Sequence, residues 1–230
     1  MIPLHDDNPT TITPLITIIL IVLCVVIFLW EVSLGQQTQQ AIFAFGAIPS
    51  VVFGSKLLPP EIALIPAWAT VLTSMFMHGG WMHLIGNMLY LWIFGNNVED
   101  CMGHGRFVVF YILCGILAFG THAAMDPNSV VPTVGASGAI SGVLGAYLLL
   151  YPHARVLVAI PFGIIIHTTR LPAGVVLVFW FVLQIISSAM DSGQGGGVAW
   201  GAHVGGFVAG MALLFLFKKR SVRLFAPRRS

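Results

Sequence analysis

The chain contains six long apolar runs, and they constrain its fold more than any other feature of the sequence. The runs cover residues 14–32, 81–97, 106–124, 133–151, 172–190 and 198–217. A bilayer core about 30 Å thick needs roughly 20 apolar residues in a helix, because the backbone groups of a span must pair within it. Hydrophobic residues make up 57% of the chain and charged residues 8%, whereas soluble domains carry roughly 25% charged residues. We therefore expect an all-α protein, a polytopic bundle of six transmembrane helices.

The basic residues indicate the orientation of this bundle. Six spans place both termini on one side of the membrane, and nine of the ten Lys and Arg residues fall on that side. Because cytoplasmic segments are enriched in Lys and Arg, the sequence predicts that both termini are cytoplasmic. Residues 1–13 are then a short cytoplasmic N-terminus, and residues 14–217 form the membrane domain. Residues 218–230 are interpreted as a basic cytoplasmic tail and not as a nucleic-acid-binding patch.

The connections between the spans are also apolar. Prolines interrupt residues 33–80, and we expect this first loop to lie in the outer membrane interface. Residues 156–167 are broken by Pro161 and are interpreted as a packed cytoplasmic connection, with a re-entrant segment as the alternative. The chain has no internal repeat, which argues against a secondary transporter. The three cysteines are widely spaced and show no disulfide or metal-binding pattern.

Polar side chains inside the spans mark a candidate site, because such groups are costly in lipid. The second run contains His83 and Asn87, the fourth contains Ser137, and the sixth contains His203. With the N-terminus inside, these three spans all start at the outer side, and the four residues lie in their first two turns. At about 1.5 Å per residue, they lie roughly 5–10 Å below the outer ends of the helices. The sequence thus predicts one polar layer that outer water can reach.

These residue types together can cleave an acyl bond. A serine hydroxyl such as that of Ser137 needs a base to accept its proton, and His203 is the candidate base. The side chains of His83 and Asn87 and the backbone N–H of Ser137 can donate hydrogen bonds to a developing oxyanion. No acidic residue lies at this depth to orient His203, so a Ser–His dyad is predicted in place of a triad.

Each of these residues also has a structural explanation. A Gly-x-Ser-Gly sequence in an apolar helix usually serves packing, and an Asn can join two helices. The residues His83, His122 and His203 could instead ligate haem. Their joint occurrence at one depth, on three parallel helices, favours catalysis.

Small residues predict close packing of the fourth and sixth spans. Gly138 and Gly142 are four residues apart, and His203, Gly206 and Gly210 share one helix face. Small residues let membrane helices approach closely. Such contact would bring Ser137 and His203 within reach of each other.

Three motifs resemble those of the rhomboid family of intramembrane serine proteases. His78-Gly-Gly-Trp-Met-His83-Leu-Ile-Gly-Asn87 is similar to the family pattern His-x-x-x-x-His-x-x-x-Asn. Gly135-Ala-Ser137-Gly138 resembles the nucleophile motif Gly-x-Ser-Gly. Ala202-His203-Val-Gly-Gly206-Phe-Val-Ala-Gly210 resembles the motif Ala-His-x-x-Gly-x-x-x-Gly.

The resemblance implies a serine endopeptidase that cleaves transmembrane segments of single- or multi-span membrane proteins near the outer face of the bilayer. It implies Ser137 as nucleophile, His203 as general base and acid, and a structural role for His78. Gly135, Gly138, Gly206 and Gly210 would support the site. No metal, cofactor or nucleic acid is expected, and the bare six-span plan suggests a bacterial plasma membrane. The fifth span, with Gln184, and the glycine-rich loop after it would be a mobile gate and cap. The alternative is a catalytically inert rhomboid-like protein that binds membrane proteins.

The chain departs from the family pattern at three positions. Ala69 follows Trp68 where some members have Arg, and Val198 replaces a Gly that some carry before the last motif. Ser141 stands four residues after Ser137, where some members have an aromatic residue packed on the base. These departures leave the dyad intact and affect loop anchoring and the orientation of His203.

Overall fold

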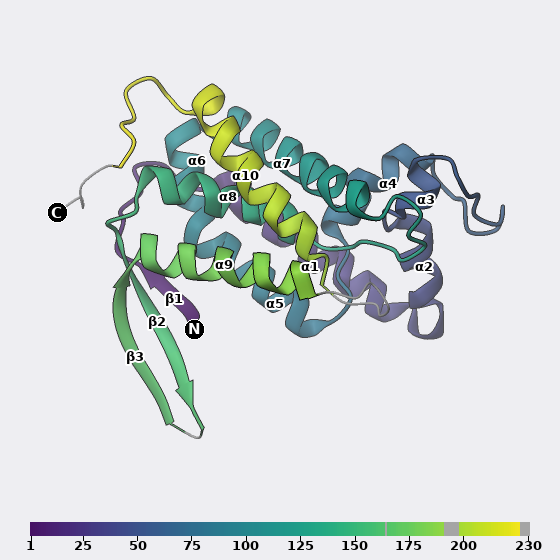
Figure 1. The fold of residues 1–230 in the computed structure, drawn as a ribbon, viewed down its shortest axis with the longest axis horizontal. Coiled ribbons are helices and arrows are strands. Elements are labelled where there is room, and N and C mark those ends of the chain that lie inside the picture. Colours follow the sequence, from purple (N-terminus) through teal and green to yellow (C-terminus); the bar gives the residue numbers. More distant parts are fainter. Residues whose placement is uncertain (164, 191–197, 226–230) are drawn as a thin grey trace.

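The computed structural model describes residues 1–163, 165–190 and 198–225, and it shows a helical bundle with a small sheet at one end (Figure 1). The helical membrane bundle predicted from the apolar runs is confirmed. Its long segments are α1 (Leu15–Ser33), α5 (Trp81–Tyr90) continued by η3 (Leu91–Gly95) and α6 (Asn96–Met102), α7 (His104–Met125), α8 (Ser137–Leu150), α9 (Ala173–Met190) and α10 (Trp200–Phe217).

The six predicted spans differ in length. Within the described residues, four helices, α1, α7, α9 and α10, are long and apolar enough to cross a membrane. The second span is divided by the π-helical turn η3. The fourth, α8, has 14 residues and begins at Ser137, later than predicted. Residues 133–136 stay outside the helix because Thr133 forms a bridge with Ala47 and Gly135 has a φ of +123°, which favours glycine.

The first loop folds into short helices at the end of the bundle opposite the C-terminus, here called the loop end (Figure 1). These are η1 (Gly35–Gln37), α2 (Thr38–Phe45), α3 (Pro49–Val52), α4 (Ala67–Thr73) and η2 (Ser74–Phe76). Several large apolar side chains remain exposed there, among them Phe53, Leu57 and Trp68. Its place in the membrane interface stays a prediction.

Residues 156–167, interpreted from the sequence as a packed connection or a re-entrant segment, form part of a three-stranded antiparallel sheet, which neither interpretation included. The strands are β1 (Ile2–Asp6), β2 (Arg155–Phe162) and β3 (Ile165–Pro172), in the order β1-β2-β3. Branched residues such as Val156, Val158 and Ile160 favour strands, and Gly163 takes a φ of +61° in the turn. Pro172 pairs with Arg155 in the sheet, so α9 begins at Ala173 and not at the proline.

The segments outside the loop end meet at the other end of the bundle, here called the terminal end. The N-terminal strand β1 pairs with β2 of the connection between α8 and α9. The Lys219 N–H, just after α10, donates to the Cys101 carbonyl beside the turn into α7. Both terminal segments and two connections therefore lie at one end, as an even number of spans requires.

The buried Glu99 side chain links α1 to α6 at this terminal end. Its carboxylate accepts hydrogen bonds from the Ile16 and Thr17 N–H groups and the Thr17 hydroxyl, at 2.7 to 2.9 Å. His104 Nδ1 lies 2.6 Å from the same carboxylate. An anion at a helix N-terminus satisfies its free N–H groups and favours the helix dipole. Glu99 thereby fixes the start of α1 against the bundle.

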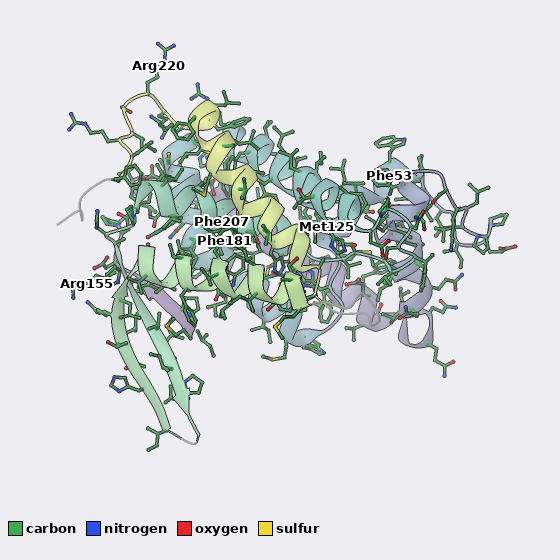
Figure 2. All side chains as sticks on the ribbon, viewed as in Figure 1. Phe53, Met125, Arg155, Phe181, Phe207 and Arg220 are labelled. Carbon is green, nitrogen blue, oxygen red and sulfur yellow. The ribbon has the colours of Figure 1, made fainter. Side chains whose placement is uncertain are left out.

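Glycines bring α8 and α10 into backbone contact, as predicted from their spacing. A Cβ atom added to Gly206 would overlap the Gly138 carbonyl oxygen, and one added to Gly210 would overlap that of Gly142. α10 packs most extensively against α8 and α7, whereas α9 contacts its neighbours less. The rings of Phe181 and Phe207 stack at 4.3 Å and join α9 to α10 (Figure 2).

Candidate active site

A cavity of about 1090 Å³ in the half of the bundle nearest the loop end contains the predicted polar residues. His83 and Asn87 line it from α5, Ser137 from α8 and His203 from α10. Gln184 of α9 lines it as well. The structure thus brings together four residues that are far apart in the sequence, and it adds a fifth.

The imidazole of His203 is buried and held on one side. Its Nδ1 lies 2.7 Å from Gln184 Oε1, which can only accept a hydrogen bond, so Nδ1 carries the proton. Its Nε2 is then the unprotonated nitrogen, and it has no hydrogen-bond partner among the described residues. The ring is therefore oriented by an amide, and a free lone pair is available on the opposite nitrogen.

Aromatic rings pack on His203 from two sides. The Trp180 ring of α9 lies 5.8 Å from the imidazole at 33°, and the Trp200 ring approaches edge-on at 5.9 Å. The resemblance to the rhomboid family described above suggested an aromatic residue for this purpose at the position of Ser141. Here the Ser141 hydroxyl instead donates to the Ser137 carbonyl at 2.6 Å, within α8. Trp180, which belongs to α9, therefore packs on the His203 ring in place of a residue of α8.

Ser137 is the first residue of α8 and is half-buried. No side chain caps this helix start, so its N–H groups remain available to an anion in the cavity. Gly135, two residues earlier, donates its N–H to the Ser74 carbonyl at 2.9 Å. A Cβ on Gly135 would lie 2.7 Å from His83 Nε2 and 3.6 Å from Ser137 Oγ, so only glycine lets these side chains approach.

No hydrogen bond joins Ser137 to His203 Nε2 in this structure. The two side chains lie on helices in backbone contact and line one cavity. Hydrogen bonds between catalytic groups are often long without substrate and tighten in the complex.

The α5 residues offer donors to the same cavity. Asn87 is buried, and its Nδ2 has no hydrogen-bond partner among the described residues. His83 is exposed, and its ring meets that of His78 edge-on at 5.3 Å. His78 is buried at the loop before α5, where its N–H donates to Glu31 Oε2 at 3.2 Å and its Nδ1 lies 3.2 Å from the Phe76 carbonyl. These contacts fit the structural role expected of His78.

Sequence reasoning missed the role of Gln184. The sequence shows a polar Gln184 within an apolar run, but the family resemblance assigned this residue to the mobile gate and not to the orientation of His203. The direction in which a residue of α9 points depends on how that helix rotates against α10, which its own sequence does not reveal. Among the described residues, no group of three or more His, Cys, Asp or Glu side chains is arranged to hold a metal ion.

The architecture and cavity define a polytopic helical membrane protein with a serine and an oriented histidine in one site. The family model described as Rhomboid domain matches residues 66–220, and the chain belongs to the rhomboid family. The matched part begins at the last residues of the first loop and ends just beyond α10. The strand β1, the helix α1 and most of the first loop lie outside it.

Curated relatives agree with this family. The chain is 33% identical over 188 residues to "Rhomboid protease GluP" of Bacillus subtilis, covering 81% of this chain and 32% of that protein. It is 30% identical over 181 residues to "Rhomboid protein 1, mitochondrial" of Saccharomyces cerevisiae, covering 74% and 48%. It is 28% identical over 168 residues to "Rhomboid-like protein 11, chloroplastic" of Arabidopsis thaliana, covering 67% and 54%. The chain thus spans about a third to a half of the length of these relatives.

Proposed function

We propose that this chain is an intramembrane serine endopeptidase that uses Ser137 as nucleophile and His203 as general base. The observation that carries the proposal is the 2.7 Å hydrogen bond from His203 Nδ1 to Gln184, which leaves Nε2 unprotonated in the cavity that Ser137 lines. Membership of a family whose relatives are named proteases supports it.

The reaction proceeds through an acyl-enzyme. Ser137 Oγ attacks the scissile carbonyl carbon while His203 Nε2 takes the hydroxyl proton. The carbonyl oxygen becomes an oxyanion, which accepts hydrogen bonds from Asn87 Nδ2, His83 and the Ser137 N–H. The C–N bond then breaks, and His203 returns the proton to the leaving amine. Water, deprotonated by the same Nε2, attacks the ester, and the Ser137 hydroxyl leaves with that proton.

The substrate class follows from the site's place in a membrane bundle. A transmembrane segment entering laterally between α5 and α9 must unwind before its carbonyl reaches Ser137. Unwound backbone is poorly tolerated in lipid, so segments with Gly, Pro or polar residues near the membrane surface are favoured. The site around Ser137 is cramped, with His83 against Gly135 and Ala118 against Gly138, and this favours a small residue before the cut.

The location of the protein is part of the proposal. We place the terminal end in the cytoplasm because nine of the ten Lys and Arg residues belong to sequence segments that an even number of spans assigns to that side, and we place the protein in a bacterial plasma membrane. Residues 1–13 and 218–230 are then cytoplasmic segments flanking the membrane domain 14–217. Two of the relatives are named mitochondrial and chloroplastic, so the family is not confined to bacteria.

The test is cleavage of a single-span reporter by purified protein in liposomes, combined with labelling by a fluorophosphonate, which modifies activated serines. Wild type is expected to cleave and to be labelled, whereas Ser137→Ala and His203→Ala do neither. Ser33→Ala, which changes an exposed serine on α1, is the matched control and keeps both activities.

The two measurements separate the competing outcomes. Cleavage that persists in Ser137→Ala overturns the assignment of the nucleophile. Folded wild-type protein that neither cleaves nor reacts with the probe supports the inert rhomboid-like binder. Labelling without cleavage identifies an active serine and an unsuitable reporter sequence.

A further inference from the structure

The β2–β3 hairpin extends beyond the helices of the described residues (Figure 1). Figure 1 shows it leaving the base of α9 and pointing to the side of the bundle instead of away from its end. Near the base, Val156 and Val158 of β2 are fully buried. Near the tip, Ile165 and Ile166 are each 68% exposed. The hairpin is therefore packed at one end and uncovered, with apolar side chains, at the other.

The side chains of the hairpin divide between two faces. Successive strand residues point to opposite faces, and paired residues share one. The inner face carries Val156, Val158 and Ile160. His167 pairs with Ile160, so Ile165, two residues before His167, lies on the same face. Val156 and Val158 on this face are buried in the hydrophobic core of the bundle. Beyond the edge of the bundle, the same face is no longer covered by helices and is exposed at Ile165.

The hairpin leaves the bundle beside a helix that is long and apolar enough to cross a membrane. α9 begins at Ala173, directly after β3, and it is a membrane-spanning helix with a largely exposed apolar surface. Val175, Val178 and Phe179 in its first two turns are each about half exposed. The uncovered inner face of the hairpin thus continues the exposed apolar surface of α9.

The charge of the hairpin complements a bilayer surface. Residues 155–172 contain Arg155 and Arg170 and no Asp or Glu. Figure 2 shows Arg155 at the base of the hairpin, where it leaves the bundle. Arg170 lies on the outer face, opposite Leu157. Basic side chains beside apolar ones are attracted to anionic headgroups, with the apolar groups below them.

We propose that the β2–β3 hairpin is a membrane anchor that lies in the interface of the leaflet at the terminal end. Ile160, Ile165 and Ile166 insert among the acyl chains, and Arg155 and Arg170 meet lipid phosphates. The two exposed tip residues, Ile165 and Ile166, point to opposite faces. A protein laid on one face would cover only one of them, whereas lipid surrounds both. This anchor does not depend on the chemistry at Ser137.

The experiment places an environment-sensitive fluorophore at the tip. Ile165→Cys is labelled with nitrobenzoxadiazole and reconstituted in phosphatidylcholine–phosphatidylglycerol vesicles, with and without nitroxide-labelled lipid. Cys24, Cys101 and Cys114 are buried, and wild-type protein measures any labelling of them. Thr168→Cys, on the exposed outer face, is the matched control.

In Ile165→Cys we expect a blue-shifted emission, quenching by nitroxide lipid and protection from iodide. In Thr168→Cys we expect less quenching by the lipid and more by iodide. A label at Ile165→Cys that iodide quenches freely and nitroxide lipid does not places the tip in water and overturns the proposal. Protection from iodide without quenching by nitroxide lipid would mean that a protein surface, such as a second copy, covers the tip, and it overturns the proposal equally.

The basic residues provide a second measurement. Arg155→Gln combined with Arg170→Gln is expected to reduce nitroxide quenching at Ile165→Cys in vesicles that contain phosphatidylglycerol. In vesicles of phosphatidylcholine alone, the same pair of substitutions should change the quenching less. Equal changes in the two lipids would contradict the role of the arginines.

Discussion

At the scale of single residues, the histidine of the candidate site is oriented by a neutral amide and not by a carboxylate. Gln184 Oε1 accepts from His203 Nδ1 and so fixes which nitrogen carries the proton. A carboxylate would in addition stabilise the imidazolium that forms during catalysis. The amide supplies orientation alone, and it keeps a second charge out of a site inside the membrane.

We predict that Gln184→Leu reduces kcat with little change in KM. The substitution leaves a buried Nδ1–H unpaired, which costs about 1–3 kcal/mol and corresponds to roughly 5- to 150-fold in rate. Gln184→Glu keeps an acceptor oxygen and should retain more activity than Gln184→Leu, with a changed pH profile. Reporter cleavage in liposomes measures both. Equal losses in the two variants, or a change confined to KM, would contradict a positioning role.

Asp6 of β1 should make stability depend on pH. Burial raises the pKa of Asp6 from 3.8 to about 6, although the Tyr147 hydroxyl donates to its carboxylate at 2.6 Å and opposes the rise. Because the folded state holds the proton more tightly, stability is full below about pH 4 and falls as the pH rises to about 6. The change amounts to about 2–3 kcal/mol, since one pKa unit equals about 1.4 kcal/mol.

Asp6→Asn removes this titration and keeps an oxygen that accepts from Tyr147. Thermal unfolding in detergent should therefore show the variant several degrees more stable than wild type at pH 7.5, at about 2–4 °C per kcal/mol. Near pH 4 the two proteins should unfold at similar temperatures. A difference that is the same at both pH values would show that the Asp6 carboxylate is not responsible.

At the scale of secondary structure, the contact between α8 and α10 depends on the absence of side chains. Gly210→Ala would force its Cβ into the Gly142 carbonyl and push apart the helices that carry Ser137 and His203. Overpacking of this kind costs about 1–3 kcal/mol, which should lower the unfolding temperature by roughly 2–12 °C. The measurement is thermal unfolding in detergent.

Gly120→Ala on α7 is the matched control for this substitution. A Cβ at Gly120 meets nothing within 4 Å, and alanine favours a helix more than glycine. The control should be as stable as wild type or slightly more stable. Equal effects of the two substitutions would mean that helix propensity, and not the close contact, determines the result.

The helices were predictable from sequence because each apolar run must pair its backbone within itself, and all six runs became helical. The hairpin was not predictable in this way. Its strand β2 has a partner, β1, that lies about 150 residues earlier in the chain. A strand pairing of this kind depends on how the bundle brings the two segments together. The residues 155–172 alone show only a short apolar stretch.

At the scale of the whole molecule, the structure separates a loop end from a terminal end. The site lies toward the loop end, and the sheet, the Glu99 contacts and both terminal segments lie at the other. Sequence reasoning brought His83, Asn87, Ser137 and His203 to one layer because topology and depth follow from counting spans. It could not provide Gln184, because the rotation of α9 is decided by packing such as that of Phe181 on Phe207.

The orientation of these two ends in the membrane can be measured with a thiol reagent that does not cross membranes. Asn128→Cys lies in the exposed connection between α7 and α8, and Ser221→Cys lies just after α10. On intact cells we expect labelling of Asn128→Cys only, and in inverted vesicles labelling of Ser221→Cys only. The reverse pattern would place the terminal end outside. Neither substitution changes the charge that sets the orientation.

The hydrogen bond between Gln184 and His203 joins two different helices, and this has a mechanical consequence. α9 is held by few contacts, and its buried residues are Ala173, Val176, Leu177 and Gln184. If α9 moved away from α10, the Gln184 amide would move with it, and the imidazole would lose the acceptor that fixes its protonated nitrogen. In the proposed protease, His203 would therefore be oriented as a base only while α9 lies against α10, and a substrate whose entry displaced α9 would leave the site inactive until the two helices met again.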